Sequence, residues 1–346
     1  MGLDGRGDEC RREEAKPLSK IRSVGLVGFG AIAEDAHLSA LRSVKVAVDA
    51  IAEPSPLRRE AAKRSAPQAR IYDRVEALLS AERSLDALIV CSPPSFHFNG
   101  VISGIRAGIH VLCEKPLTLD PEQFAIIQTE SAAKNVCVYS INNWAYSPQW
   151  SRLLEIAASG RLGAVRHAEI RVLRTKPSVS ALPGDWRKDP AISGGGILVD
   201  HGWHNLYLMR RLLGPELTLV NTVLHPTGSV DEIATALFTA PDASGAMHLS
   251  WRAGERSNSA FVAGERGTAE LRDDSLTVKS GGVEETTRFP EKLSGGSAHP
   301  EWLAAMWPAF ENECAGRGRG ENLSEAAFCL TTIRAAYSAK EASAVE

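Results

Sequence analysis

The chain has 346 residues, of which 44% are hydrophobic and 23% are charged. At the usual domain size of roughly 100 to 200 residues, this length predicts two domains. The 39 Lys and Arg against 42 Asp and Glu give a formal net charge of −3, which argues against a protein that binds nucleic acid over its whole surface.

The first twenty residues alternate charged and small side chains and lack the apolar stretch of a secretory signal. We therefore interpret residues 1–20 as a disordered leader and expect a cytoplasmic protein. No apolar run approaches the roughly 20 residues that a membrane helix needs, so no membrane partner is expected. Six cysteines, at positions 10, 91, 113, 137, 314 and 329, lack the spacing of a disulfide framework or a zinc site, and we expect buried, reduced thiols.

Short apolar runs alternate with helical patterns between residues 21 and 141. The predicted strands are 24–27, 44–52, 85–90, 110–113 and 136–140, and the predicted helices are 57–66, 75–81, 98–107 and 121–134. Continuous apolar runs are typical of strands buried on both faces. Their alternation with helices predicts an N-terminal α/β domain, residues 21–141, with a parallel, doubly wound sheet.

A glycine motif, G-x-G-x-x-A, follows the first predicted strand and opens a helical pattern. Gly28 permits a tight turn, Gly30 lets the backbone approach a pyrophosphate, and Ala33 lets the helix pack close to the strand. The helix N-terminus then offers unpaired N–H groups to the phosphates. This context predicts a dinucleotide site formed by Gly28, Phe29, Gly30, Ala31, Ile32 and Ala33.

Glu53 lies at the end of the second predicted strand, 20 residues after Ala33. An acidic side chain at this place accepts hydrogen bonds from the ribose 2′-OH, which favours NAD. Ser55, Arg58 and Arg59 could instead hold a 2′-phosphate, so NADP is the alternative cofactor. The two arginines are one helical turn into the next element and are expected to face solvent, and NAD is therefore preferred.

Two further segments, 91–97 and 113–116, lie at the ends of the predicted strands 85–90 and 110–113. This is the sheet edge where open α/β sheets bind ligands. Lys115, in the sequence Glu-Lys-Pro, would bring an ammonium group to the mouth of the cleft. Such a group can donate a proton to a carbonyl during reduction or take one from an alcohol. A surface lysine before a turn proline is the alternative. The additional residues predicted to bind the cofactor are Glu53, Ser92, Pro93, His97, Glu114 and Lys115.

After residue 141 the pattern changes to successive extended runs joined by turn residues. Helices are predicted at 149–159, from the glycine turn 194–196 to 213, at 302–314 and at 324–344, and strands at 165–173, 217–224, 233–239, 245–251, 259–263, 268–271 and 275–279. This order predicts a C-terminal α+β domain, residues 142–346, with a large open mixed or antiparallel sheet. Its open face would serve substrate binding or subunit contact.

Asp200 and His204 lie four residues apart in the predicted helix after the glycine turn, so they should share one face. A carboxylate beside an imidazole suits general acid or base chemistry next to a hydroxyl. A surface pair and half of a metal site with His201 are the alternatives. No third ligand follows at a matching spacing, and we predict no metal site.

Together, the glycine motif, the sequence Glu-Lys-Pro at 114–116 and the run GGGILVDHGWH resemble the Gfo/Idh/MocA family of NAD(P)-dependent oxidoreductases. The run is similar to the family pattern G-G-G-x-x-x-D-x-G-x-H, and the resemblance spans residues 22–339. It implies an N-terminal Rossmann domain, a C-terminal domain with a large open sheet, and a homodimer or homotetramer formed through that sheet.

The resemblance assigns catalytic roles to Lys115 as the active-site lysine, to Asp200 as the substrate-binding acid and to His204 as the histidine acting on the reacting hydroxyl. It implies hydride transfer between the nicotinamide and a hydroxyl or keto carbon of a sugar, sugar derivative or cyclitol. Tyr207 stands where many members have an aspartate, which weakens assignment to inositol dehydrogenases. The alternatives are a non-sugar carbonyl or dihydrodiol as substrate, and a non-catalytic dinucleotide- or sugar-sensing protein.

Overall fold

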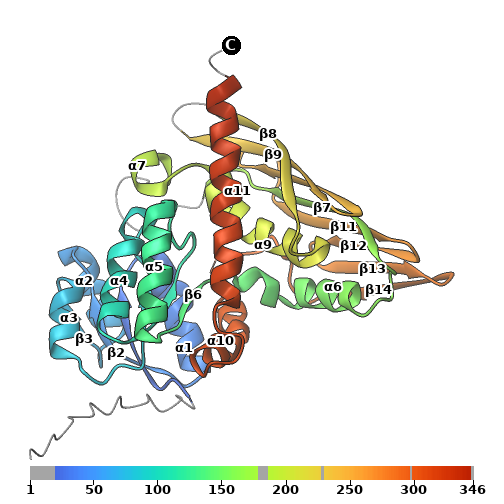
Figure 1. Cartoon of the computed structure of the whole chain (residues 1–346). Coiled ribbons are helices and arrows are strands. Elements are labelled where there is room, and N and C mark those ends of the chain that lie inside the picture. The colour runs from blue at the N-terminus through green and yellow to red at the C-terminus, as the bar shows by residue number, and fades with distance from the viewer. Residues whose placement is uncertain (1–19, 178–185, 227–229, 297, 344–346) are drawn as a thin grey trace, which may run out of the picture.

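The computed structural model describes residues 20–177, 186–226, 230–296 and 298–343. Two β-sheets lie side by side, and helix α11 (Glu321–Ser343) runs between them (Figure 1). The predicted leader falls outside the described residues except for Lys20. None of the described helices is both long and apolar enough to span a bilayer.

The first sheet has six parallel strands in the order β3-β2-β1-β4-β5-β6. Its strands are β1 (Ser23–Val27), β2 (Ala47–Ala52), β3 (Arg70–Tyr72), β4 (Ala87–Val90), β5 (His110–Cys113) and β6 (Val138–Ser140). Its helices are α1 (Leu38–Ser43), α2 (Pro56–Ser65), α3 (Val75–Ala81), α4 (His97–Arg106) and α5 (Pro121–Lys134). In β4, Ile89 packs in one core cluster with Leu41 of α1, whereas Val90 packs in another with Val101 of α4. Both faces are therefore covered, which confirms the predicted doubly wound sheet.

Local geometry differs from prediction at three places in this half. The predicted strand 44–52 begins only at Ala47, because Lys45 adopts a left-handed turn conformation with φ 61°. The helix after the glycine motif begins as a π-helical segment, η1 (Ala33–His37), before α1. Strand β3 was not predicted, because only three half-exposed residues form it.

The second sheet has eight strands in the order β14-β13-β12-β11-β7-β10-β9-β8. Its strands are β7 (Val165–Leu173), β8 (Thr218–Pro226), β9 (Asp231–Ala240), β10 (Ala243–Ser250), β11 (Ser257–Gly264), β12 (Gly267–Arg272), β13 (Ser275–Ser280) and β14 (Val283–Arg288). Strands β7 and β10 are parallel and the other pairs are antiparallel, so the sheet is mixed, as predicted. Strand β14 was not predicted, because its sequence VEETTR is exposed throughout and has no apolar alternation.

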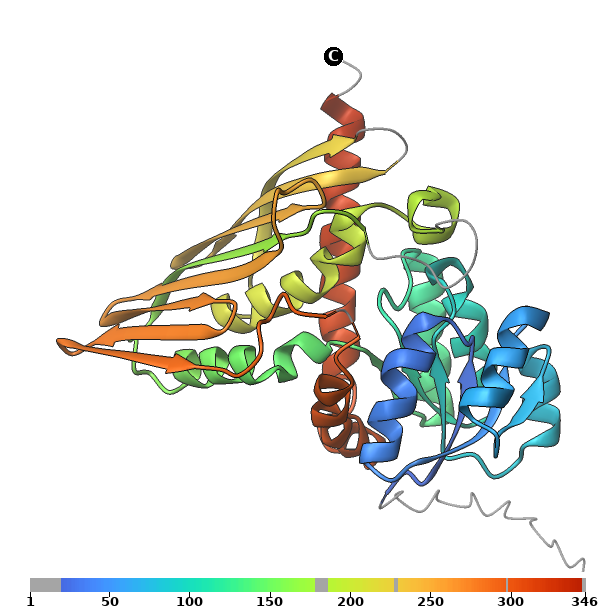
Figure 2. The ribbon, with the colours of Figure 1, turned by 180° about the vertical axis from the view of Figure 1, so that it is seen from behind.

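Helices cover one face of this sheet and leave the other open (Figure 2). Helix α9 (Gly202–Leu213) packs on β7 and β10, α6 (Pro148–Ala158) packs on β12 and β13, and α11 packs on β8. In β9 the buried residues Ala236 and Phe238 flank the exposed Leu237. This alternation is that of a sheet with one face against a core and one open face.

The predicted helix from the glycine turn to residue 213 is two helices. Helix α8 (Ile197–Asp200) ends where the Asp200 carbonyl accepts a hydrogen bond from the Lys115 ammonium group at 2.6 Å. In a continuous helix this carbonyl would accept the His204 amide. The helix resumes as α9 after His201, so the expectation that Asp200 and His204 share one helix is wrong.

The last two helices join the halves of the chain. Leu303 and Phe310 of α10 (Pro300–Cys314) lie in the same core cluster as Val24 of β1. The Asn322 side chain of α11 bonds both the amide and the carbonyl of Ser140 in β6, at 2.6 and 2.9 Å. Shorter helical segments are η2 (Pro94–Phe96), η3 (Asn143–Tyr146), η4 (Trp186–Lys188) and α7 (Pro190–Ser193). The five described cysteines, at 91, 113, 137, 314 and 329, are buried and free, as predicted, and Cys10 lies outside the described residues.

Candidate active site

A cavity of about 720 Å³ opens at the carboxyl ends of the strands of the first sheet, and both halves of the chain line it. From the first half come the segments that follow β1, β2, β4 and β5. From the second half come side chains of η3, α8, α9 and the loops at the ends of β7 and β11. The cavity therefore brings the predicted dinucleotide segment and the predicted catalytic residues into one site.

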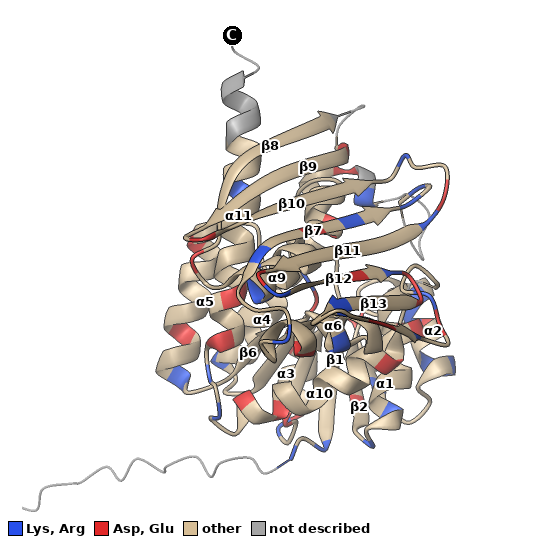
Figure 3. Cartoon of the chain, turned by 90° about the vertical axis from the view of Figure 1, so that its right-hand side faces the viewer, with Lys and Arg blue, Asp and Glu red and all other residues tan. Residues whose placement is uncertain are grey.

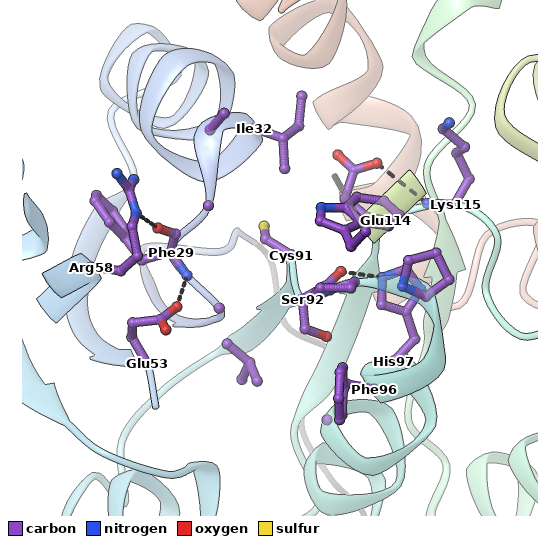
Figure 4. A pocket seen from close by; sticks show the side chains of 18 of the residues that line it. Phe29, Ile32, Glu53, Arg58, Cys91, Ser92, Phe96, His97, Glu114 and Lys115 are labelled. Atoms are coloured by element: carbon purple, nitrogen blue, oxygen red, sulfur yellow. Dashed lines mark hydrogen bonds between the residues drawn. The ribbon is translucent and has the colours of Figure 1, made fainter. Parts of the chain in front are cut away.

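The glycine turn forms one wall of the cavity (Figure 4). Gly28 has φ 88°, and a Cβ atom there would lie 2.7 Å from the Ser92 amide nitrogen, so the position requires glycine. At Gly30 a Cβ atom would meet no described atom within 4 Å, so this backbone borders open space. Ala31 and Ile32 also line the cavity. The predicted site residue Ala33 does not, because it is buried in the core beneath the turn.

Glu53 lies beside the glycine turn, as the sequence predicts. Its Oε2 accepts the Phe29 amide at 2.7 Å and its Oε1 accepts the Ser55 amide at 2.8 Å (Figure 4). The Phe29 amide is therefore already bonded within the protein, and the Phe29 ring is fully buried. A carboxylate has about four lone-pair sites, so Glu53 keeps acceptor capacity toward the cavity.

Arg58 turns inward, which corrects the expectation that both arginines of this segment face solvent. Its Nε donates to the Phe29 carbonyl at 2.7 Å, and its Nη2 pairs with Glu34 at 2.6 Å. The Ser55 hydroxyl caps α2 and starts the helix next to the glycine turn, which explains the direction of Arg58. Arg59 is half-buried and bonds the Glu53 and Pro54 carbonyls at 3.0 and 2.8 Å.

The segment after β4 contributes three predicted residues, Ser92, Pro93 and His97, to the cavity wall. The two ring nitrogens of buried His97 lie 2.6 Å from the carbonyl oxygens of Pro116 and Ser92. His97 therefore ties the loop after β4 to the loop after β5. The Ser92 hydroxyl is buried and has no hydrogen-bond partner among the described residues.

Glu114, a predicted site residue, lines the cavity and bonds the first helical segment. Its Oε1 is 2.8 Å from Nε2 of buried His37. Its Oε2 accepts the Lys115 amide at 3.3 Å (Figure 4). Burial raises the pKa of Glu114, but the hydrogen bond and charge of His37, with the charge of Lys115, lower it below its usual value. Glu114 is therefore an ionised group that fixes the backbone on which Lys115 stands.

Lys115 and Asp200 form an ion pair between residues 85 positions apart. Lys115 Nζ donates to Asp200 Oδ1 at 2.7 Å and to the Asp200 carbonyl at 2.6 Å. His201 Nδ1 lies 3.4 Å from the other carboxylate oxygen. Burial raises the pKa of Asp200, but the charges of Lys115 and His201 hold it well below its usual range. Asp200 is thus ionised and holds the lysine ammonium in place.

His204 lies in the same cavity but is not the partner of Asp200 that the four-residue spacing predicts. Asp200 instead pairs with Lys115 and His201, because the chain leaves the helix at His201. The His204 ring stacks on Trp144, with ring centroids 5.3 Å apart. Burial, and then the charges of Lys115 and His201, hold the pKa of His204 well below its usual range. His204 is therefore a neutral imidazole.

The second half adds residues that the sequence did not assign to the site. They are Asn143, Trp144, Arg174, Trp186, Arg187, His201, Arg256 and His299. Trp144 follows β6 in η3, so its place after a strand end was the available signal. Arg174 and Arg256 flank strands of the mixed sheet, and a strand pattern alone does not indicate which ends of such a sheet meet a cavity.

Comparison with known proteins identifies both halves of the chain. Residues 22–142 match the oxidoreductase family with an NAD-binding Rossmann fold, and residues 150–270 match the GFO/IDH/MocA C-terminal domain. Inositol 2-dehydrogenase of Corynebacterium glutamicum (strain R) is 32% identical over 165 residues, 47% of this chain and 48% of that protein. D-glucoside 3-dehydrogenase of Escherichia coli (strain K12) is 29% identical over 203 residues, 57% and 56% of the two chains. The chain spans about half the length of these curated relatives.

Solved structures show the same fold over nearly the whole chain. Levoglucosan dehydrogenase in complex with NADH and levoglucosan superposes with a TM-score of 0.80 at 18% identity, covering 92% of this chain and 96% of that one. A 3-ketoreductase from Actinomadura kijaniata in complex with NADP gives a TM-score of 0.77 at 21% identity, covering 92% and 98%. The two matching domain models and the shared fold show that the chain belongs to the Gfo/Idh/MocA family of oxidoreductases.

Proposed function

We propose that this protein is an NAD(P)-dependent dehydrogenase or reductase whose substrate is a sugar, a sugar derivative or a cyclitol. The observation that carries the proposal is one cavity that joins the glycine turn to Lys115, Asp200 and His204. The names of similar proteins, inositol 2-dehydrogenase and D-glucoside 3-dehydrogenase, support a polyhydroxylated substrate.

The residues present fit a dinucleotide. The open space at Gly30 leaves room for a pyrophosphate against the backbone, and the Ser92 hydroxyl is a buried donor that still lacks a partner among the described residues. Gly28, Gly30, Glu53, Ser92 and Pro93 would hold the cofactor. When bound, its nicotinamide would supply the hydride chemistry and leave proton handling to the protein.

The chain's own groups can manage the hydroxyl proton. A lysine ammonium has three N–H donors, and Lys115 uses two of them on Asp200, so one remains for a substrate oxygen. His204 is neutral and can accept the proton of a substrate hydroxyl. Asp200 holds the Lys115 side chain in place, and its remaining lone pairs can accept a neighbouring substrate hydroxyl.

A dehydrogenase assay tests this function directly. The purified protein is incubated with NAD or NADP and a panel of sugars, sugar acids, amino sugars and cyclitols, and the reduced cofactor is followed by absorbance. Turnover of at least one polyhydroxylated compound is expected. Turnover of only a diketone or a dihydrodiol would favour the non-sugar alternative. Dinucleotide binding without turnover of any compound would contradict an enzyme and favour a sensing protein.

We further propose that NAD is the preferred cofactor, because the Glu53 carboxylate would repel a 2′-phosphate. Like charges a few ångströms apart repel by about 1 to 4 kcal/mol, so roughly tenfold or more discrimination is expected. Arg58 offsets little of this repulsion, because its charge is already paired with Glu34.

Fluorescence titration should therefore give a lower Kd for NADH than for NADPH, and Glu53→Ser should shift the preference toward NADPH. Glu60→Ser is the matched control, since Glu60 is an exposed acid paired with Lys63 and lies outside the cavity wall. Tighter binding of NADPH to the unmodified protein would contradict the prediction and make Arg58 a phosphate ligand.

We also propose a homodimer or homotetramer formed through the open face of the eight-stranded sheet. Strands β8, β9 and β10 carry few charged side chains over most of their length (Figure 3). Val220, Val223 and Leu237 on this sheet are 62%, 49% and 49% exposed. Val223 pairs directly with Thr235, two residues before Leu237, so the two apolar side chains share one face.

Leu237→Glu should shift the protein from oligomer to monomer in sedimentation experiments, because a charge would be buried in the interface. Leu57→Glu is the matched control: Leu57 is also an exposed leucine, but it lies on α2 of the first half. A monomeric unmodified protein, or an oligomer that Leu237→Glu leaves intact, would contradict this assembly.

A further inference from the structure

The substrate end of the cavity carries an excess of positive charge. Among the described residues that the second half of the chain contributes to the wall, Asp200 is the acid, and Arg174, Arg187 and Arg256 are the bases. Asp200 is already paired with Lys115. Arg174 and Arg256 therefore add positive charge to this wall beyond that paired with Asp200.

Arg174 is almost fully buried, with 6% of its surface exposed, yet its described hydrogen bonds go to neutral groups. Its Nη1 donates to the Leu173 carbonyl and to the Asn258 side-chain oxygen, both at 2.8 Å. A buried charge is ordinarily paired with an opposite charge. The ion pairs formed within the described part of the chain do not include Arg174.

Arg256, at the rim of the cavity, is exposed, but its described hydrogen bonds also go to neutral groups. Its Nε donates to the Ser294 carbonyl at 3.1 Å and its Nη2 to the Gly296 carbonyl at 2.7 Å. Burial and the charge of Arg256 together lower the pKa of Arg174 to about 10, and Asp273 and Asp200 offset this only in part. Leu173 of β7 pairs with Ser257 of antiparallel β11, so Arg174 and Arg256, the next residues outward, lie at the same end of the sheet. Arg174 Nη1 donates to the Ser257 carbonyl at 3.4 Å, and an anion bound at this end would lessen the repulsion between the two guanidinium groups.

Two other cations that line the cavity are paired with acidic side chains. Arg58, at the glycine-turn end, is paired with Glu34 at 2.6 Å, and Lys115 is paired with Asp200 at 2.7 Å. In these two pairs the positive charge is neutralised within the protein. Arg174 and Arg256 differ because their described partners are carbonyl and amide oxygens.

The arginines also lie close to the proposed proton-handling residues. The Arg174 guanidinium carbon is 6.0 Å from the centroid of the Trp144 ring, and the His204 ring stacks on the same Trp144 at 5.3 Å. Arg174 and His204 therefore both lie against the Trp144 ring. One substrate molecule can contact both side chains.

We propose that the substrate is an anionic carbohydrate, whose carboxylate or phosphate group is bound by Arg174 and Arg256 while its reacting hydroxyl lies at Lys115 and His204. Guanidinium groups match the planar, bidentate geometry of carboxylate and phosphate oxygens. This inference rests on the proposed oxidoreductase function and narrows its substrate class.

Matched pairs of neutral and anionic sugars test the inference. Initial rates are compared for D-glucose with D-glucuronate, D-galactose with D-galacturonate, and D-glucose with D-glucose 6-phosphate. We expect kcat/KM for an anionic member to exceed that of its neutral partner by at least about tenfold, the effect of one charged hydrogen bond. The uronates and the phosphate ester distinguish a carboxylate from a phosphate site. Higher kcat/KM for every neutral partner would overturn the inference.

Two variants locate the anion site. Arg256→Gln should lower the ratio of anionic to neutral kcat/KM by about tenfold, since it removes one charged donor. Arg174→Gln should lower the ratio as well. Because Arg174 is buried, its replacement can also disturb the core, whereas Arg256→Gln changes an exposed side chain. Arg166→Gln is the control: Arg166 lies at the other end of β7, pairs with Glu265 and is outside the cavity wall. An unchanged ratio in Arg256→Gln and Arg174→Gln would overturn the assignment.

A binding measurement separates failure of the inference from failure of the proposed function. The same five compounds are titrated against the cofactor-loaded protein and followed by tryptophan fluorescence, since Trp144 lines the site. Tighter binding of the anionic sugars, weakened by added salt, supports the anion site even where no compound is turned over. Turnover without a preference for the anionic sugars in rate or binding contradicts the anion site and leaves the oxidoreductase function standing.

Discussion

Replacing Lys115 with alanine is expected to lower turnover by about 10² to 10⁴, the usual contribution of one general acid or base. The ammonium group is held at the junction of the two halves by the carboxylate and the carbonyl of Asp200. Alanine removes the remaining N–H donor from the place where a substrate oxygen would bind. Steady-state kinetics with the best substrate of the panel measures the effect.

Lys63→Ala is the matched control, because Lys63 is exposed, pairs with Glu60 and lies outside the cavity wall. NADH binding should survive in Lys115→Ala, which separates a catalytic defect from a folding defect. Turnover close to that of the unmodified protein would remove Lys115 from the mechanism.

Because Lys115 Nζ contacts Asp200, the effects of Lys115→Ala and Asp200→Ala should fall well short of additivity in the double mutant.

Replacing Asp231 with alanine should reduce the free energy of unfolding by roughly 3 to 5 kcal/mol, because three buried donors lose their acceptor at about 1 to 3 kcal/mol each. Asp231 begins β9 and is 2% exposed. Its carboxylate accepts the amides of Gly196 and Leu198 at 2.8 and 2.9 Å and the Tyr337 hydroxyl at 2.5 Å. The substitution leaves these donors without the carboxylate that joins β9, α8 and α11.

Urea denaturation measures this loss, and Tyr337→Phe is the graded control, because it removes only one of the three donors. We expect about 1.5 to 2 kcal/mol for the control, near the lower end of the range for one hydrogen bond to a charged group. Activity should fall as well in Asp231→Ala, since α8 carries Asp200. A loss no larger than that of Tyr337→Phe would show that the carboxylate does not hold this turn.

The contact between Asp231 and α8 also requires glycine at position 196. A Cβ atom at Gly196 would lie 1.8 Å from the Asp231 carbonyl oxygen. Gly196 therefore allows close packing against β9, which lets the Asp231 carboxylate reach the first turn of α8. The last glycine of the family-like G-G-G pattern thus positions α8, the short helix that ends at Asp200.

Several features of this protein follow from short stretches of sequence. The glycine motif requires glycine at Gly28 because φ is positive and the Ser92 backbone lies against it, a constraint that acts within one strand, turn and helix. The buried strands β4 and β5 are short, continuous apolar runs, and Glu53 follows a strand end. Each of these signals is local, so periodicity and spacing were enough to predict them.

Other features depend on contacts between distant segments. The helix break at His201 arises because Lys115, 85 residues earlier, takes the Asp200 carbonyl as an acceptor, and a four-residue spacing cannot show this competition. Arg58 turns inward because Glu34 and the Phe29 carbonyl lie within its reach. Sequence alone thus determined the doubly wound sheet, the dinucleotide segment and the identity of the chemical groups. The tertiary structure decided which groups are partners, because pairing depends on packing across the two sheets, and local patterns carry no information about that packing.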